Sequence, residues 1–145
     1  MRRLLLFFVA VSVALALVSG CVASGGSSSS SIPNIVGRWE STSTFPIDIN
    51  YDGTPDTYGK YVMIVENQNG STFTGLFGGV ELSSGIQFFL PMTGTITSGG
   101  NIVITVTLTD PTTGQTVTAT SQGVYASGRI TIIGENQTID LVKVQ

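Results

Sequence analysis

Between residues 32 and 145, apolar and polar side chains alternate over short stretches that are separated by Gly, Asn, Ser and Pro. A period of two places successive side chains on opposite faces of a β-strand. The clearest stretch is Asn101 to Thr109, where one face is aliphatic and the other consists mainly of threonine. No stretch has apolar residues at helical spacing, so the pattern predicts an all-β domain.

The same alternation predicts eight strands joined by short turns. Turn-forming pairs such as Asn69-Gly70, Ser84-Gly85 and Ser127-Gly128 separate them and supply positive φ or a preset turn. Strands connected in this way form an antiparallel meander, and eight of them can close into an up-and-down barrel. The alternative is a two-sheet β-sandwich. The expected strands are Val36–Thr44, Lys60–Glu66, Thr72–Phe77, Ile86–Thr97, Asn101–Asp110, Gln115–Tyr125, Arg129–Ile133 and Thr138–Val144.

Bulky side chains on the expected inner faces are numerous enough to fill an eight-stranded interior. Pro91 falls inside the fourth expected strand and cannot donate to a ladder, so we expect a bulge or bend there. The side chains expected inside are Trp39, Phe73, Phe77, Phe88, Leu90, Ile104, Val106 and Tyr125.

The N-terminal segment differs in character from the domain. It has two arginines, an apolar run from Leu4 to Val18, and then small residues up to Cys21. The run is shorter than the roughly 20 residues that a membrane-spanning helix needs, which indicates a secretory signal peptide over residues 1–20.

The last residues of this segment, Val18-Ser19-Gly20-Cys21, resemble the lipobox of bacterial lipoproteins. The resemblance implies that Cys21 receives a diacylglycerol, becomes the first residue after cleavage, and holds the chain in the lipid bilayer through its acyl chains, palmitate among them. Cys21 is the only cysteine, so it has no disulfide partner within the chain. The alternative is an ordinary secretory signal with a chance cysteine.

Residues 21–31 are rich in Ser and Gly and predict a flexible tether before the domain at 32–145. Ten such residues reach roughly 16 to 19 Å. By resemblance to Gram-negative sorting, Val22 is not the aspartate that retains lipoproteins at the inner membrane. We therefore expect an extracytoplasmic, membrane-anchored protein, with the outer membrane favoured.

Composition excludes several function classes. The segment after residue 20 has four Lys and Arg against nine Asp and Glu, a net charge of −5, so nucleic acid is not an expected partner. The chain has no histidine, which excludes Ser-His-Asp and Cys-His catalysis and the usual zinc sites. The remaining carboxylates lie near strand ends or turns, so we expect no enzymatic activity.

Gly37-Arg38-Trp39 opens the first expected strand, and the last one contains Lys143. Gly-x-Trp at this place resembles the start of the lipocalin and avidin-like barrels. The resemblance implies that Trp39 closes one barrel end and that Lys143 packs near it. The alternative is that Trp39 is a core aromatic and Lys143 a surface charge. The sequence contains no biotin-type or retinol-type pocket motif, so no ligand residues are carried over.

Residues 48–56, DINYDGTPD, match the Asp-x-[Asp/Asn]-x-[Asp/Asn]-Gly pattern of calcium loops. This spacing directs alternate oxygens to one side of a tight loop, and the glycine permits the turn. The expected ligands from this pattern are the side chains of Asp48, Asn50 and Asp52 and the carbonyl of Thr54.

The loop is not an EF-hand, because Gly59 stands where the bidentate glutamate would be. It resembles the Asp-x-Asp-x-Asp-Gly-x-x-Asp loops of extracellular β proteins such as FG-GAP repeats, which implies Asp56 as the last ligand. We expect a structural Ca²⁺. The alternative is a solvated loop whose residues are there for the turn alone.

Two function classes remain. In the first, the barrel is a non-catalytic interaction or structural module for an envelope protein or glycan. In the second, it carries a small apolar or amphipathic ligand, as lipocalins do. The bulk of the expected inner side chains favours the first class.

Overall fold

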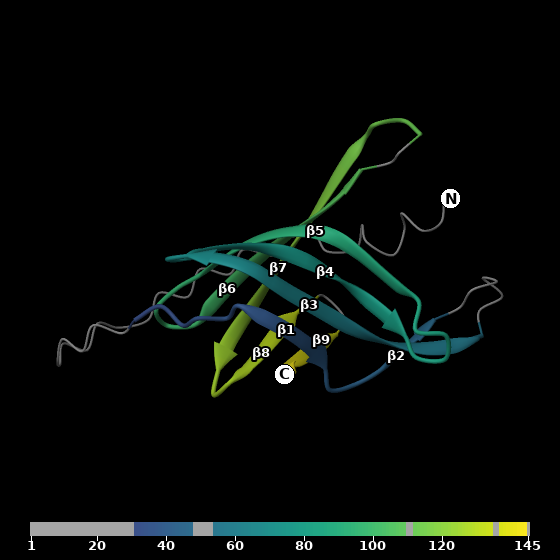
Figure 1. Cartoon of the computed structure of the whole chain (residues 1–145), viewed down its shortest axis with the longest axis horizontal. Coiled ribbons are helices and arrows are strands. Elements are labelled where there is room, and N and C mark those ends of the chain that lie inside the picture. The colour runs from purple at the N-terminus through teal and green to yellow at the C-terminus, as the bar shows by residue number, and fades with distance from the viewer. Residues whose placement is uncertain (1–30, 48–53, 110–111, 135–136, 145) are drawn as a thin grey trace.

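The computed structural model describes residues 31–47, 54–109, 112–134 and 137–144, and every regular element in them is a β-strand. Figure 1 shows these strands wrapped around a common interior. The strands are β1 (Gly37–Ser41), β2 (Phe45–Ile47), β3 (Thr57–Asn69), β4 (Thr72–Glu81), β5 (Gln87–Ile96), β6 (Asn101–Thr109), β7 (Thr116–Ala126), β8 (Arg129–Ile133) and β9 (Thr138–Val144).

All strand pairs are antiparallel, and the sheet closes on itself. Its order is β1-β9-β8-β7-β6-β5-β4-β3-β2, and β1 also pairs with β3. Because β1 and β2 both pair with β3, they share one position, and the closed barrel has eight positions. The predicted eight-stranded, lipocalin-like barrel is confirmed, and the sandwich alternative is wrong.

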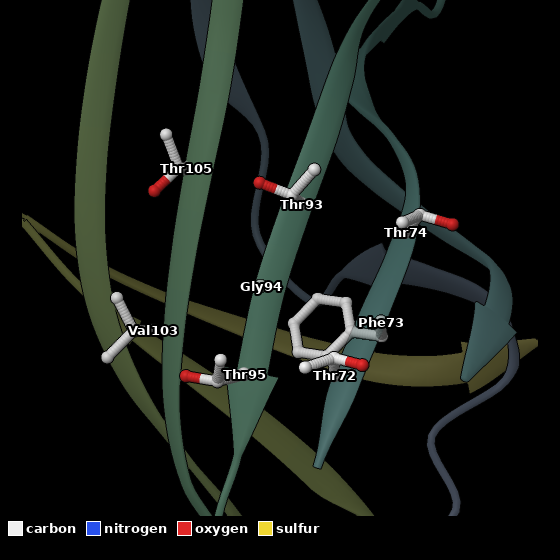
Figure 2. A pocket seen from close by; sticks show the side chains of 8 residues that line it. All are labelled: Thr72, Phe73, Thr74, Thr93, Gly94, Thr95, Val103 and Thr105. Atoms are coloured by element: carbon white, nitrogen blue, oxygen red, sulfur yellow. The ribbon is translucent and has the colours of Figure 1, made fainter. Parts of the chain in front are cut away.

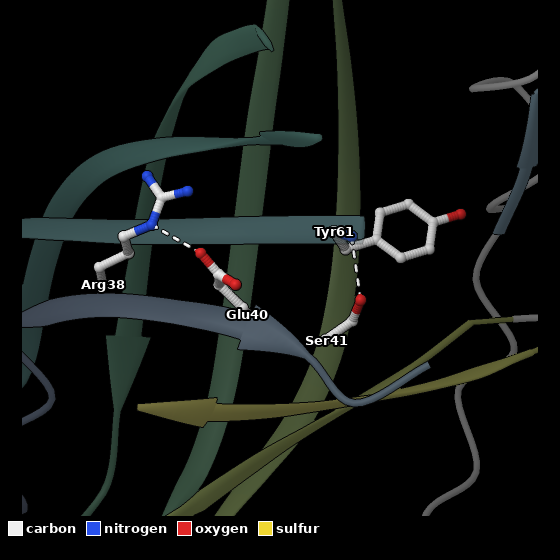
Figure 3. A network of polar contacts seen from close by, with 4 residues as sticks. All are labelled: Arg38, Glu40, Ser41 and Tyr61. Atoms are coloured by element: carbon white, nitrogen blue, oxygen red, sulfur yellow. Dashed lines mark hydrogen bonds and ion pairs between the residues drawn. The ribbon is translucent and has the colours of Figure 1, made fainter. Parts of the chain in front are cut away.

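The first expected strand, Val36–Thr44, is interrupted at Ser41. β1 pairs with the middle of β3, whereas β2 pairs with its start. Between them the Ser41 hydroxyl accepts a hydrogen bond from the Tyr61 backbone N–H at 3.0 Å (Figure 3). The same hydroxyl donates to the Ser43 carbonyl at 2.6 Å. The buried serine therefore substitutes for a ladder partner where the two strands separate.

Pro91 marks the end of the ladder between β5 and β6, and it causes no register shift between β4 and β5. The β4–β5 pairing runs past it with Leu76 opposite, and no shift occurs there. The β5–β6 pairing, in contrast, stops at Met92. The missing N–H at position 91 explains why the ladder between β5 and β6 ends there, and no bulge occurs at the proline.

The core is a single cluster of apolar side chains inside the barrel. Of the eight expected inner residues, four are buried and three more are half-buried against the cluster, whereas Phe88 is 45% exposed. The buried members are Ile35, Trp39, Met63, Val65, Phe73, Met92, Ile96, Ile102, Ile104, Val106, Ile130, Ile132 and Leu141.

Candidate functional site

One end of the barrel is built around Trp39. Its ring N–H donates to the carbonyl of Ile35 at 2.8 Å, and its ring meets Tyr125 edge-on with centroids 6.1 Å apart. The ammonium of Lys143 lies 5.7 Å from the centre of the Trp39 ring, within range of a cation–π interaction. The two residues named from the family resemblance thus lie together at this end.

Gly37 makes this arrangement possible. Its φ is +131°, and a Cβ at this position would lie 2.7 Å from Cε of Lys143. Any larger residue would displace the lysine side chain from Trp39 and strain the backbone. The Gly-x-Trp spacing therefore has a steric explanation in this chain.

Gln68 holds the N-terminal segment against the same end. Its carbonyl oxygen accepts the N–H of Ile35 at 2.9 Å, and its amide donates to the carbonyl of Pro33 at 2.8 Å. Ile35 is consequently buried within the core. The sequence pattern did not identify Gln68 or Ile35, because neither belongs to a motif and their contact spans 33 positions.

The opposite end carries exposed apolar side chains, which we call the apolar tip. They come from the start of β3, the β4–β5 turn and the start of β5. The N–H of Leu82 donates to the carbonyl of Tyr58 at 2.9 Å. The register places Phe88, with Ile86, on the opposite face of the sheet from Tyr58. Of the eight large apolar side chains that are exposed in the described chain, four are at this end. Exposed apolar area of this kind marks interaction sites. The tip consists of Tyr58 (52% exposed), Leu82 (51%), Ile86 (67%) and Phe88 (45%).

Glu81 organises the turn beneath the tip. Its carboxylate accepts hydrogen bonds from the backbone and hydroxyl groups of Ser83 and Ser84, and from the Thr57 hydroxyl at 2.6 Å. The bonds from Ser83, Ser84 and Thr57, in that order of effect, hold the pKa of Glu81 well below its usual range. The carboxylate thereby fixes the conformation of the turn.

Beneath the tip, three aromatic rings stack inside the barrel. Tyr61 lies between Phe45, at a centroid distance of 4.2 Å, and Phe77, at 6.2 Å. Together with the core cluster, these rings place side chains along both halves of the interior. Aromatic and aliphatic side chains of the protein thus face the interior at both levels.

The expected calcium loop begins and ends at neighbouring backbone positions. Ile47 pairs with Thr57, and the N–H of Asp56 donates to the carbonyl of Ile47 at 2.9 Å. Asp48, Asn50 and Asp52 lie outside the described residues, so of the expected ligands only Thr54 and Asp56 are placed. Elsewhere in the described chain no three acidic, Cys or His side chains form a metal-binding group.

The outer face of the barrel has a shallow, open hollow over β4, β5 and β6. Figure 2 shows the Phe73 ring lying beside Gly94, with threonines around it. Phe73 is opposite Gly94 in the β4–β5 ladder, so the ring occupies the space that a side chain would fill. The hollow has hydroxyl and methyl groups and no charged lining residue, which gives it little to orient a specific ligand.

Cys21 also lies outside the described residues. Among those described, no helix is long and apolar enough to cross a membrane. Comparisons of the chain with protein-family models, with curated proteins and with solved structures found no match.

Proposed function

We propose that the protein is a membrane-anchored extracytoplasmic lipoprotein whose barrel is a non-catalytic interaction module. Acylated Cys21 would insert in the bilayer, and residues 22–31 would separate the barrel from the lipid headgroups. The observation that carries the proposal is the position of the apolar tip relative to the tether.

The tether joins the barrel at the end where Gln68 binds Pro33 and Ile35. The tip begins at Tyr58, ten residues away along the same strand, which corresponds to roughly 30 Å. Figure 1 shows the chain entering at one end of the barrel, with β2 and the β4–β5 turn at the other. The apolar tip is therefore at the barrel end farthest from the point where the tether attaches, where it is accessible to a partner.

The tip favours a protein partner over a glycan, because its four side chains offer apolar area and only one hydroxyl. The ring stack in the interior favours this module over the alternative, a carrier of a small apolar ligand. A carrier would need the stacked rings of Phe45, Tyr61 and Phe77 to move apart.

The experiment places a photo-crosslinking residue at Ile86 of the full chain in exporting cells, with Ile133 as the matched control. Both positions are isoleucines on the barrel surface, 67% and 53% exposed. We expect discrete protein adducts from position 86 alone. Equal patterns at both positions, or no adduct at position 86, would contradict an interaction site at the tip.

The anchor is tested separately by metabolic labelling with a palmitate analogue. We expect labelling of the natural chain and none of Cys21→Ser. Absence of label in the natural chain would remove the lipoprotein assignment and leave the tip experiment unaffected.

We also propose that the loop at 48–56 binds a structural Ca²⁺. The support is the ligand spacing in the sequence together with the paired ends of the loop at Ile47 and Thr57. Such an ion would hold the loop beside Tyr58 at the tip.

A further inference from the structure

The hairpin of β6 and β7 is longer than the strands beside it. β5 pairs with β6 only as far as Val106, and β8 pairs with β7 only from Gln122 onward. Within the described chain, residues 107–109 therefore pair with 116–118 alone, and residues 116–121 pair with β6 alone. Figure 1 shows this part of the hairpin projecting from the barrel wall.

The stretch Thr116–Ser121, which we call the free edge of β7, has a row of backbone groups without a ladder partner on its outer side among the described residues. Natural proteins blunt such edges with charged side chains, proline or bulges. The free edge has none of these, since it reads TVTATS and pairs with β6 without a register shift. It is thus a competent template for another strand.

We propose that the free edges of β7 in two copies of the chain pair antiparallel about a two-fold axis, forming a dimer with one continuous sheet across it. A two-fold axis perpendicular to the sheet keeps the outer faces of both copies on the same side. With the axis at Ala119, Thr118 lies opposite the partner's Thr120. With the axis at Thr118, Thr118 lies opposite the same residue of the partner copy.

Either register places threonine against threonine on the outer face. The hairpin already uses this pairing, because the hydroxyls of Thr105 and Thr120 are 3.2 Å apart and those of Thr109 and Thr116 are 3.3 Å apart. On the other face the paired side chains are Val117, Ala119 and Ser121, which are small and half-buried. The dimer interface would therefore contain the same threonine–threonine pairs that join β6 and β7 within one copy.

Charge distribution favours a second copy at this edge. The chain has a net charge of −3, so most of its surface repels an identical molecule. The whole hairpin from Asn101 to Gly128 contains one charged residue, Asp110, in the turn. A stretch of six residues is about 20 Å long, which is comparable with an ordinary strand pairing.

The test is sedimentation equilibrium of the full chain in a non-ionic detergent that keeps its apolar N-terminal segment dispersed. The perturbing variant is Thr118→Lys with Thr120→Lys, which puts lysine opposite lysine in both registers. The matched control is Thr93→Lys with Thr95→Lys, two exposed threonines on the same outer face but away from the free edge. Circular dichroism checks that each variant is folded.

We expect a monomer–dimer equilibrium for the natural chain and for the control. In the 118/120 lysine variant the dissociation constant should rise by at least about tenfold, because like charges face each other across the pairing. The corresponding double glutamate variant should also dissociate, and an equal mixture of the lysine and glutamate variants should dimerise again.

A natural chain that is monomeric at every concentration overturns the proposal, as does a dimer that the edge and control variants weaken equally. If the natural chain is monomeric but a synthetic peptide TVTATS binds it, the edge accepts an extended peptide and the dimer proposal fails.

Discussion

The substitution Gly94→Ala tests the close packing of the Phe73 ring against Gly94. Gly94 faces Phe73 across the β4–β5 ladder, and Phe73 is 2% exposed. An alanine Cβ at position 94 would lie 2.6 Å from Cε2 of the Phe73 ring, closer still to its Cζ, and 2.6 Å from the carbonyl oxygen of Val103. Neither neighbour can give way easily, because the ring is buried and the carbonyl belongs to β6.

Overpacking of this kind costs about 1 to 3 kcal/mol. Because a ring and a backbone oxygen are both in the way, we expect the upper half of that range. The control is Gly99→Ala, where an added Cβ would meet nothing closer than 3.8 Å. Urea denaturation of the full chain, followed by the fluorescence of its single tryptophan, gives the free energy of unfolding for each variant.

The double variant Phe73→Ala/Gly94→Ala distinguishes the clash with the Phe73 ring from the clash with the Val103 carbonyl oxygen. Phe73→Ala alone should cost about 3 to 5 kcal/mol. If the ring is the main obstacle, the double variant should be more stable than the sum of the single losses by about 0.5 to 2 kcal/mol. Strict additivity, or a Gly94→Ala chain as stable as Gly99→Ala, would refute this account of the Phe73–Gly94 contact.

Three further predictions concern the turn, the interrupted strand and the loop. Glu81→Gln should destabilise the chain at neutral pH. Since the pKa of Glu81 is depressed in the folded state, the difference in stability between the natural chain and the variant should shrink as the pH falls below the ordinary value of 4.5. Thermal melts at a series of pH values measure this difference. An unchanged difference at acidic pH would contradict this. Ser41→Ala should cost about 1 to 3 kcal/mol because it leaves the Tyr61 N–H without its acceptor, whereas Ser43→Ala, which loses an exposed hydroxyl, should have little effect in the same denaturation assay. Ca²⁺ at about 100 times its dissociation constant should stabilise the natural chain by about 2.7 kcal/mol and leave the stability of Asp52→Ala unchanged. Equal melting temperatures of the natural chain with Ca²⁺ and with chelator would contradict Ca²⁺ binding by the loop.

The strands predicted most accurately are those that the local sequence pattern defines without reference to an adjacent strand. β5 to β9 each begin and end within one residue of the expected bounds, because alternating side chains and the turn residues between the strands mark them locally. β4 extends beyond its expected end at Phe77 through Gly78 and Gly79, which resemble a turn in sequence. A Cβ at Gly79 would lie 2.6 Å from the Phe88 ring, so this glycine is in a strand for reasons that only the neighbouring strand reveals.

The sites show the same division. Trp39 and Lys143 were named from a family resemblance, and the closure of the sheet brings them together through the β1–β9 ladder. Gln68, which fixes the N-terminal segment, and the apolar tip were not predicted. Both depend on which turns the fold places at each end of the barrel, and a single sequence carries no local signal for that arrangement.

The continuity of β3 has a mechanical consequence. One strand connects the point where Gln68 binds the N-terminal segment with the tip at Tyr58. A pulling force applied between these two points would run nearly parallel to this strand, so the hydrogen bonds on its two sides would be sheared together rather than opened one after another. Loading many bonds at once resists extension far better than peeling, so the barrel would be stiff under tension between its two ends.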